Sequence, residues 1–328
     1  AAVGTIQNDD WTGVEVWTGA VAGSDSWDDD GNWLDGTAPL ADGSATVAFT
    51  NSQCTNCNVD INANIDVAGF WMFSDYTGTI TQLTTNTIDV GTGAWQQASG
   101  DFMGGSGNIT FDTASGSDFL LLGGSFTSTS TVLELKHNID IQSTSTFSHD
   151  NGKLRIASVS SSAFSAPTSI FNDVDFDMNN AQTLTISGII DIDGDIDFEH
   201  TGSSSQFVDS GEIHASGDIT VTYNGPQGGG STKIVLDGST PQSVSSATID
   251  DNLPGPLEIN SSSTVNFGTY VAIDGGITVN SGTVNAAGST VKIGDGHSPG
   301  TTIDTGTTIF DNFVIKSHQI TSVAGDLD

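Results

Sequence analysis

Apolar and polar residues alternate along most of this chain in blocks of three to five positions. Leu184-Thr185-Ile186, Val265-Asn266-Phe267 and Ile277-Thr278-Val279 are examples, and each is followed directly by Ser, Gly or Asn. A period of two residues is typical of a β-strand that buries one face, and small polar residues suit tight turns. The pattern therefore predicts an all-β protein built from short strands.

The alternating blocks also recur at a regular spacing. Three successive sets of large apolar residues share the same internal spacing, at offsets of 24 and 21 residues: Phe102, Ile109 and Phe111, then Phe126, Leu133 and Leu135, then Phe147, Leu154 and Ile156. Strand-containing periods of about 20 to 30 residues are typical of solenoids. We predict a parallel β-helix, or β-solenoid, with two or three strands per coil. A β-sandwich is the alternative fold, but its strands seldom align with one another in sequence.

A longer unit is visible in the second half of the chain. Three apolar pairs begin its copies, and residues 171–176 also match residues 310–315 position by position: the pairs are Leu154/Ile156, Ile234/Leu236 and Val291/Ile293. We expect these segments to occupy equivalent places in three long repeats. The third copy breaks off within the unit, so we expect the chain to associate end to end with copies of itself or to continue into further repeats.

The first hundred residues differ in composition from the rest. They hold both cysteines and all six tryptophans: Trp11, Trp17, Trp27, Trp33, Trp71 and Trp95. Bulky aromatic residues gathered at one end of a repeat array are typical of a cap over the exposed core. We therefore divide the chain into a Trp-rich N-terminal cap with the first coils, residues 1–100, and a repetitive β-solenoid, residues 101–328.

The net charge of the chain limits which partners it can bind. The chain has 6 Lys and Arg against 40 Asp and Glu, a net charge of −34. Phosphate contacts require Lys and Arg, so nucleic acids and anionic membranes are not expected as partners. No apolar run approaches the roughly 20 residues of a membrane-spanning helix. The acidic composition fits either adaptation to a salty habitat or binding of specific cations, and the sequence leaves both open.

Two groups of carboxylates are candidate calcium ligands. One is Asp191, Asp193, Asp195 and Asp197, around Gly194, and the other is Asp28 and Asp30, beside Gly31. Calcium takes six to eight oxygen ligands of this kind. Neither group has the spacing or terminal Glu of an EF-hand loop, and a solvated acidic face is the alternative.

Cys54 and Cys57 form a C-x-x-C motif between polar residues and the alternating segment Val59-Asp60-Ile61. No helical pattern lies near them, as a thioredoxin-like redox site would require. No second pair of ligands completes a zinc site either. A structural disulfide is the favoured interpretation, and it implies an oxidising compartment.

The chain resembles the adhesin-like repetitive parallel β-helix proteins of bacterial surfaces, including autotransporter and filamentous-haemagglutinin-type passengers. The resemblance rests on Trp17-Thr18-Gly19, Trp27, Asn32-Trp33, Pro39 and Asp42, on residues 76–82, and on the Gly-x-Phe and Asp-Gly-Asp-Ile blocks. These motifs are short and of low complexity, although they cover nearly the whole chain. The resemblance implies export and an extracellular or cell-surface role, and it implies no reaction.

A structural or adhesive extracellular protein is accordingly the expected function, without enzymatic activity. Such a protein would be a self-assembling filament subunit or a stalk segment of an adhesin, with glycans as further candidate partners. The alternative is a polysaccharide-binding or polysaccharide-degrading β-helix protein. Carboxylate pairs are easily supplied by an acidic chain, but no nucleophile–base pair is apparent. The six histidines, at positions 137, 149, 200, 214, 297 and 318, are scattered.

Overall fold

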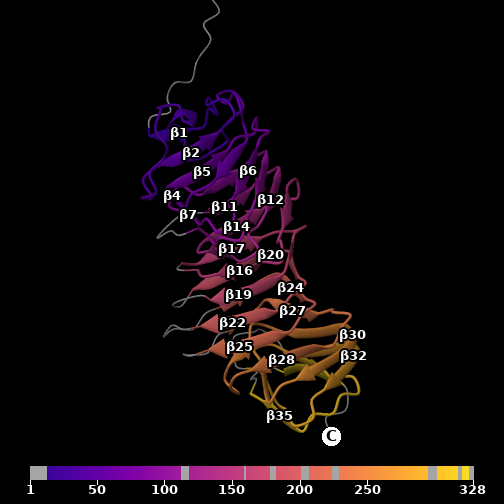
Figure 1. Ribbon diagram of the computed structural model, residues 1–328. Helices are drawn as coiled ribbons and strands as arrows, with labels where there is room; N and C mark the ends of the chain where they lie inside the picture. Colours follow the sequence, from indigo (N-terminus) through magenta and orange to yellow (C-terminus); the bar gives the residue numbers. More distant parts are fainter. Residues whose placement is uncertain are drawn as a thin grey trace, which may run out of the picture.

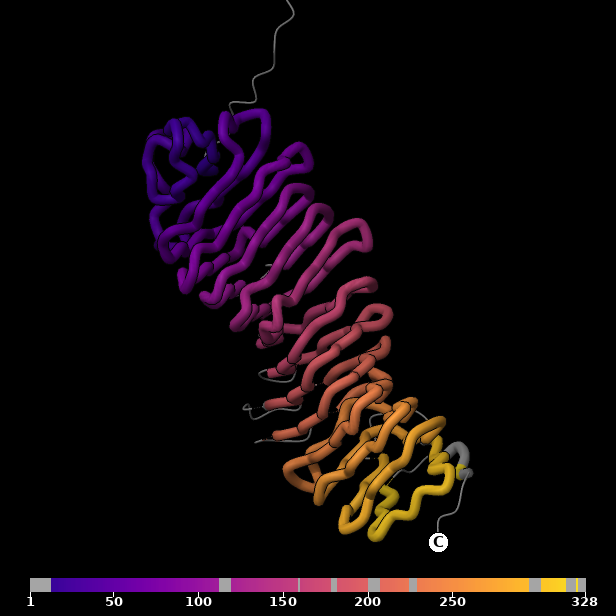
Figure 2. Tube along the Cα trace, turned by 45° about the vertical axis from the view of Figure 1, so that its right-hand side comes forward, coloured from indigo at the N-terminus to yellow at the C-terminus, as the bar shows by residue number. Residues whose placement is uncertain are grey.

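The protein is a stack of β-coils. A computed structural model describes residues 13–111, 118–158, 160–177, 182–200, 207–223, 229–294, 301–316 and 320–324. Within these ranges there is no α-helix, and the one helical element is the 3-10 turn η1 (Asp30–Asn32). Figures 1 and 2 show the strands lying side by side along an elongated body, in chain order from one end to the other. The prediction of an all-β parallel solenoid is confirmed.

Strands from successive coils pair in parallel and form stacks, here called lines, that run along the body. Face 1 is a ten-stranded sheet: β1 (Val14–Val16), β2 (Thr46–Phe49), β5 (Gly69–Met72), β8 (Trp95–Gln97), β11 (Asp118–Leu121), β14 (Asn138–Ile141), β17 (Ser162–Ser165), β20 (Thr183–Ser187), β23 (Phe207–Asp209) and β26 (Gly229–Gly230). Face 2 is a five-stranded sheet: β3 (Val59–Ile61), β6 (Thr79–Gln82), β9 (Asp101–Met103), β12 (Ser125–Thr127) and β15 (Thr146–Ser148).

Face 3 closes the coil. Its strands are β4 (Ile65–Val67), β7 (Ile88–Val90), β10 (Ile109–Phe111), β13 (Val132–Leu135), β16 (Lys153–Ile156), β19 (Asp173–Asp177), β22 (Ile196–His200), β25 (Ile219–Tyr223) and β28 (Gln242–Ser246). From β2 to β16 the chain therefore passes through faces 1, 2 and 3 in turn, whereas from β17 to β28 other strands take the place of face 2.

Two further lines complete the second half. The β18 line lies against the end of face 2, since the rings of Phe147 and Phe171 are 5.0 Å apart. It contains β18 (Ile170–Phe171), β21 (Ile189–Ile192), β24 (Glu212–Ala215), β27 (Lys233–Leu236), β30 (Leu257–Phe267), β32 (Ile277–Asn285), β34 (Thr301–Asp304) and β36 (Ile320–Ala324). The last line contains β29 (Asn252–Leu253), β31 (Tyr270–Ile273), β33 (Thr290–Ile293) and β35 (Asn312–Ile315).

The short repeat found in the sequence matches the register in which the strands of successive coils pair. Phe102 pairs with Phe126, and Phe126 pairs with Phe147, in the parallel sheet of face 2. The companion residues agree, since Ile109 pairs with Leu133 and Leu133 with Leu154 on face 3. Like side chains therefore lie above one another in the core, where the rings of Phe102 and Phe126 stack 4.8 Å apart.

The longer repeat is not a structural unit. Its three apolar pairs lie on β16, β27 and β33, which belong to face 3, the β18 line and the last line. The physical reason is that every line uses the same pattern, two apolar residues around an outward-facing one. Sequence similarity between these distant copies therefore reflects a common strand environment. It does not show that the copies occupy equivalent places in the fold.

Aromatic residues close the N-terminal end of the stack, as predicted. Trp17, Trp27 and Trp33 are fully or almost fully buried, and Trp33 packs edge-on against both others, at 5.3 and 4.8 Å between ring centroids. Trp27 also lies 6.2 Å from Phe70 of the coil core, and the Trp33 indole N–H donates to the Trp27 carbonyl. Trp95 is instead a core residue of face 1, and Trp11 lies outside the described residues.

Candidate functional site

The candidate calcium ligands of the N-terminal cap bind parts of the cap itself. Asp28 accepts a hydrogen bond from the Asn62 side chain at 2.6 Å, and Asp30 accepts one from the Ala38 amide at 2.9 Å. Between them, Asp29 accepts from the Gly31 amide at the start of η1. These carboxylates hold the loop around η1 in place.

The second candidate group is divided between different surfaces. Asp191 lies on β21 and is 3.9 Å from His214, whereas Asp197 lies on β22 of face 3 and is 3.4 Å from Lys153. Asp193 and Asp195 lie in the turn that joins the two strands. Within the described ranges, no three His, Cys, Asp or Glu side chains form a group arranged to hold a metal ion. Calcium binding stays a prediction, to be tested in solution.

Asp195 belongs instead to a ladder of side chains at the corner before face 3. The amide of Asp195 donates to the Asp173 carboxylate at 3.0 Å, and the amide of Asp218 donates to the Asp195 carboxylate at 2.9 Å. The ladder continues because the Ser243 amide donates to Asp218 at 2.7 Å. Each carboxylate thus supports the next coil at a turn whose amides the sheets leave unpaired.

The two cysteines lie close together, in the loop between β2 and β3. Their Cα atoms are 5.3 Å apart, within the range of a disulfide. The same loop is fixed to the cap because the Trp17 indole N–H donates to the Asn56 carbonyl at 2.8 Å. Their covalent state, and the compartment that it implies, remain predictions.

A row of charged side chains crosses the outside of face 3. Glu134, Arg155, Asp175 and Asp197 pair in register on the successive strands β13, β16, β19 and β22. The Arg155 guanidinium bonds Glu134 at 3.1 Å and also Asp177, and its Nε lies 3.8 Å from Asp175. The only arginine of the chain therefore joins carboxylates from two neighbouring coils.

Burial perturbs one carboxylate of this row, that of Asp175. Asp175 and Asp177 are only 7% and 3% exposed, although both point away from the core. Removal from water, together with the negative charge of Glu199, raises the pKa of Asp175 to about 6. Among the described side chains, Asp175 and Asp177 each keep one buried carboxylate oxygen without a hydrogen-bond partner. We call Glu134, Arg155, Asp175, Asp177, Asp197 and Glu199 the Arg155 cluster.

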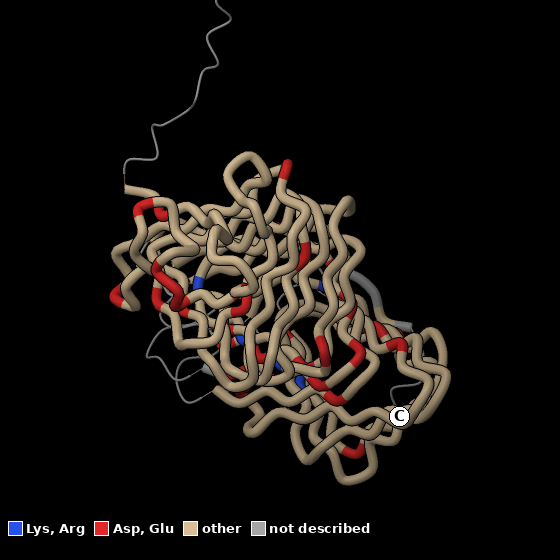
Figure 3. The backbone as a smooth tube through the Cα atoms, turned by 45° about the horizontal axis from the view of Figure 1, so that its top comes forward, with Lys and Arg blue, Asp and Glu red and all other residues tan. Residues whose placement is uncertain are grey.

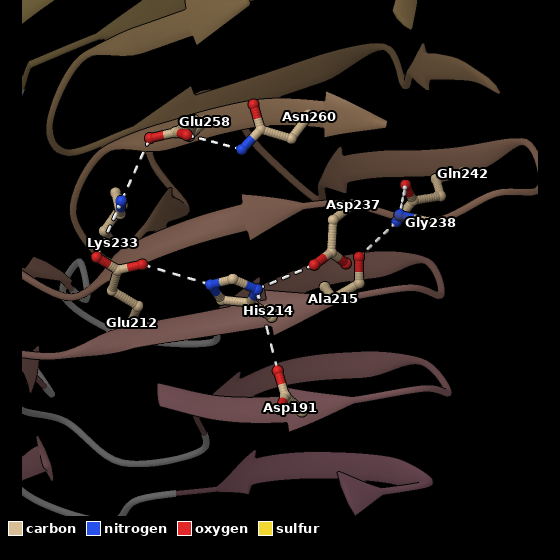
Figure 4. A network of polar contacts seen from close by, with 10 residues as sticks. All are labelled: Asp191, Glu212, His214, Ala215, Lys233, Asp237, Gly238, Gln242, Glu258 and Asn260. Carbon is tan, nitrogen blue, oxygen red and sulfur yellow. Dashed lines mark hydrogen bonds and ion pairs between the residues drawn. The ribbon is translucent and has the colours of Figure 1, made fainter. Parts of the chain in front are cut away.

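A second charged network lies on the outside of the β18 line (Figure 4). His214 Nδ1 is 2.9 Å from Asp237, and His214 Nε2 is 3.4 Å from Glu212. Lys233 bridges Glu212 at 2.9 Å and Glu258 at 3.3 Å, which joins three successive coils. The hydrogen bond from Lys233 is the main cause that lowers the pKa of Glu212. Like the Arg155 cluster, this network ties coils together.

The sequence offered only an indirect signal for these two networks. Arg155 is 21 residues from Glu134 and 22 from Asp177, so the pairs are invisible without the coil register. The usable signal was the repeat itself, which places Glu134 beside Arg155 once Leu133 and Leu154 are aligned.

The fold defines this chain as a parallel β-solenoid protein. No protein-family model, no curated protein and no solved structure matches it. In the part of the chain that the structure describes, no helix has the length and apolar character needed to cross a membrane.

Proposed function

We propose that this protein is an extracellular structural or adhesive protein, and that its solenoid assembles end to end into longer rods. Its charged networks support a mechanical role, because their charged pairs and hydrogen bonds link side chains of successive coils. Acidic residues lie along the whole body (Figure 3), as expected for a highly soluble surface protein. The resemblance to bacterial adhesin-like solenoids points the same way.

The difference between the two ends of the described stack carries the proposal. At the N-terminal end, Trp17, Trp27 and Trp33 cover the core. At the other end, Ile309 is 77% exposed, and Val314, Ile315 and Val323 on or near the last strands are also exposed. Among the described strands, β35 and β36 each pair on one side only. The unpaired backbone groups of such an edge are a template for another chain, and apolar side chains beside them favour being covered. A second copy, or further repeats of a longer protein, would cover them.

Charge would govern this assembly. Two bodies that each carry −34 repel one another, and salt or bridging cations weaken that repulsion. Light scattering and electron microscopy should therefore show monomers at low ionic strength and rods when salt or calcium is added. Magnesium at matched ionic strength separates specific calcium bridging from screening.

A pair of variants makes the test sharper. Ile309→Asp places a charge on the exposed end and should prevent assembly, whereas Ile189→Asp places the same charge at an exposed apolar position in the middle of the stack and should not. A protein that stays monomeric under every salt and cation condition would refute end-to-end assembly.

One observation favours the alternative, a polysaccharide-degrading enzyme. Asp175 has a pKa of about 6 and lies next to Asp177 and Asp197, as a general acid would lie beside a second carboxylate. Its side chain is nearly buried beneath Arg155, so we assign the cluster to coil stacking. Release of reducing ends from a panel of polysaccharides, abolished by Asp175→Asn, would establish the enzymatic function instead.

A further inference from the structure

The outward side of face 1 changes character at β5 and β11, which lie on either side of β8. Along β17 and β20 the outward positions carry Ser, Thr and Ala. On β5 and β11 they carry Trp71 and Leu120, and the corners that follow carry Phe73 and Leu122. Trp71 faces outward because its neighbours Phe70 and Met72 are both buried in the core. Phe73 and Leu122 are 38% and 41% exposed.

These side chains surround a surface hollow of about 370 Å³, which is within the size range of small-ligand sites. It is lined mainly by Trp71, Phe73, Ser74, Gln96, Ala98 and Leu122. The hollow exists because Phe73, Ala98 and Leu122 occupy the same corner of three successive coils, where each amide donates to the coil before it. The small side chain of Ala98 leaves a gap between the two large ones.

The walls of the hollow are held in place before any ligand arrives. The Trp71 indole N–H donates to the Gly93 carbonyl at 2.9 Å, which fixes the ring against the next coil. Gln96 pairs in register between Trp71 and Leu120, and its side chain is exposed. The fixed Trp71 ring reduces the entropy lost on binding, and the exposed Gln96 amide is available to hydrogen-bond a ligand.

The lining contains no ionisable side chain, although the chain has 40 acidic residues. All Lys and Arg residues lie at position 136 or later in the sequence, so none comes from the coils that form the hollow. A ligand with carboxylate or sulfate groups would meet no counter-charge here and would be repelled by the net charge of −34.

We propose that this hollow binds a neutral glycan. A sugar ring presents an apolar C–H face that packs on aromatic side chains, here Trp71 and Phe73, and a rim of hydroxyl groups. The Gln96 amide and the Ser74 hydroxyl both donate and accept hydrogen bonds, so they pair with such hydroxyls. A second copy of the chain fits less well, because the end-to-end contact proposed above uses the last strands, whereas the hollow lies on face 1 over β5, β8 and β11. This inference specifies the class of ligand for the adhesive role proposed above. It does not depend on end-to-end assembly.

Binding to neutral and charged polysaccharides tests the proposal. Affinity electrophoresis and titration calorimetry would use soluble β-glucan, xylan and mannan, with alginate and polygalacturonate as acidic counterparts. We expect at least one neutral polysaccharide to bind and the acidic ones not to bind. Trp71→Ala removes the wall and Gln96→Ala removes the amide, and each should weaken binding about tenfold.

Ala98→Leu is the decisive variant, because it fills the hollow and leaves Trp71 and Gln96 in place. It should abolish binding, while Ile189→Ala, an exposed apolar truncation on the β18 line, should bind like the parent protein. Circular dichroism and melting curves confirm that each variant is folded. If Trp71→Ala does not fold, the Gln96 and Ala98 variants still decide the question.

Two outcomes would overturn the proposal. One is the absence of binding to any neutral polysaccharide, or binding that Ala98→Leu leaves unchanged. The other is a self-associated species that Ala98→Leu dissociates, since the hollow would then be an interface between copies. A monomeric protein that binds glycan would refute only the assembly proposal. A rod-forming protein that binds none would refute only this inference.

Discussion

The raised pKa of Asp175 predicts that part of the folding stability is lost as the pH rises. The carboxyl has a pKa of about 6 in the folded protein, against an ordinary value of 3.8. Between these two values the folded state retains a proton that the unfolded chain has released. Since stability falls with pH wherever the folded state binds more protons, the contribution is complete below about pH 4 and lost above about pH 6.

The size of the effect follows from the shift. One pKa unit corresponds to about 1.4 kcal/mol, so a shift of roughly two units is worth about 3 kcal/mol. Glu199 and Asp177 oppose ionisation of Asp175, and Lys153 and Arg155 favour it. The pKa of Asp175 therefore reflects the balance of charges in the whole cluster. We expect its full contribution to the free energy of unfolding to be about 2–3 kcal/mol.

Asp175→Asn isolates this contribution, because an amide does not titrate. Urea unfolding, followed by circular dichroism between about pH 4.5 and pH 7.5, should show the parent protein losing about 1–2 kcal/mol relative to the variant, because roughly a third of the contribution is already lost at pH 4.5. Asp193→Asn, at an exposed turn position, is the matched control and should follow the parent protein. Parallel stability curves for the parent and Asp175→Asn across this range would show that the reasoning is wrong.

Four further predictions concern the cross-links, the corners, the cysteines and the cation. Arg155→Ala should lower the free energy of unfolding by about 1–3 kcal/mol, because nearly buried carboxylates lose their counter-charge and a 38% exposed arginine is partly screened; an unchanged urea midpoint would contradict this. Gly124→Ala should be far more disruptive than Gly188→Ala in melting experiments, since both have positive φ but only at Gly124 does an added Cβ lie 2.1 Å from a backbone oxygen. Alkylation without reduction, followed by mass spectrometry, should leave Cys54 and Cys57 unlabelled, and two labelled thiols would exclude the disulfide. If the acidic groups bind calcium, it should raise the melting temperature more than magnesium does, whereas equal shifts would indicate screening alone.

The carboxylates show why local motifs were a poor guide to the site. Asp191, Asp193, Asp195 and Asp197 are close in sequence, but a corner of the solenoid separates Asp191 from Asp197. Asp175 and Arg155 are 20 residues apart and lie side by side. In a solenoid, outward-facing neighbours come from the next coil, so a cluster within one turn of chain says little about which charges meet.

The hollow near Trp71 shows the same effect for apolar residues. Concentration of tryptophan in the first hundred residues correctly indicated a cap, but Trp71 is an outward-facing residue and Trp95 a core residue of face 1. Only the stacking of Phe73, Ala98 and Leu122 at one corner reveals a cavity. Their spacings of 25 and 24 residues carry no pattern that distinguishes a gap from ordinary turns.

The sequence by itself determined the strands, their parallel stacking and the closed N-terminal end. Those features depend on the alternation of apolar residues, on a recurring period and on composition, which are all local properties of a chain that must bury one side of each strand. Only the tertiary structure decided which charges pair, which line of strands each repeat joins and where the surface is hollow. Coil lengths vary, as with Phe119 and Ile139 at 20 residues and Phe70 and Trp95 at 25. A difference of one residue at a turn changes which outward-facing side chains become neighbours, because it reverses the side of the strand on which they lie.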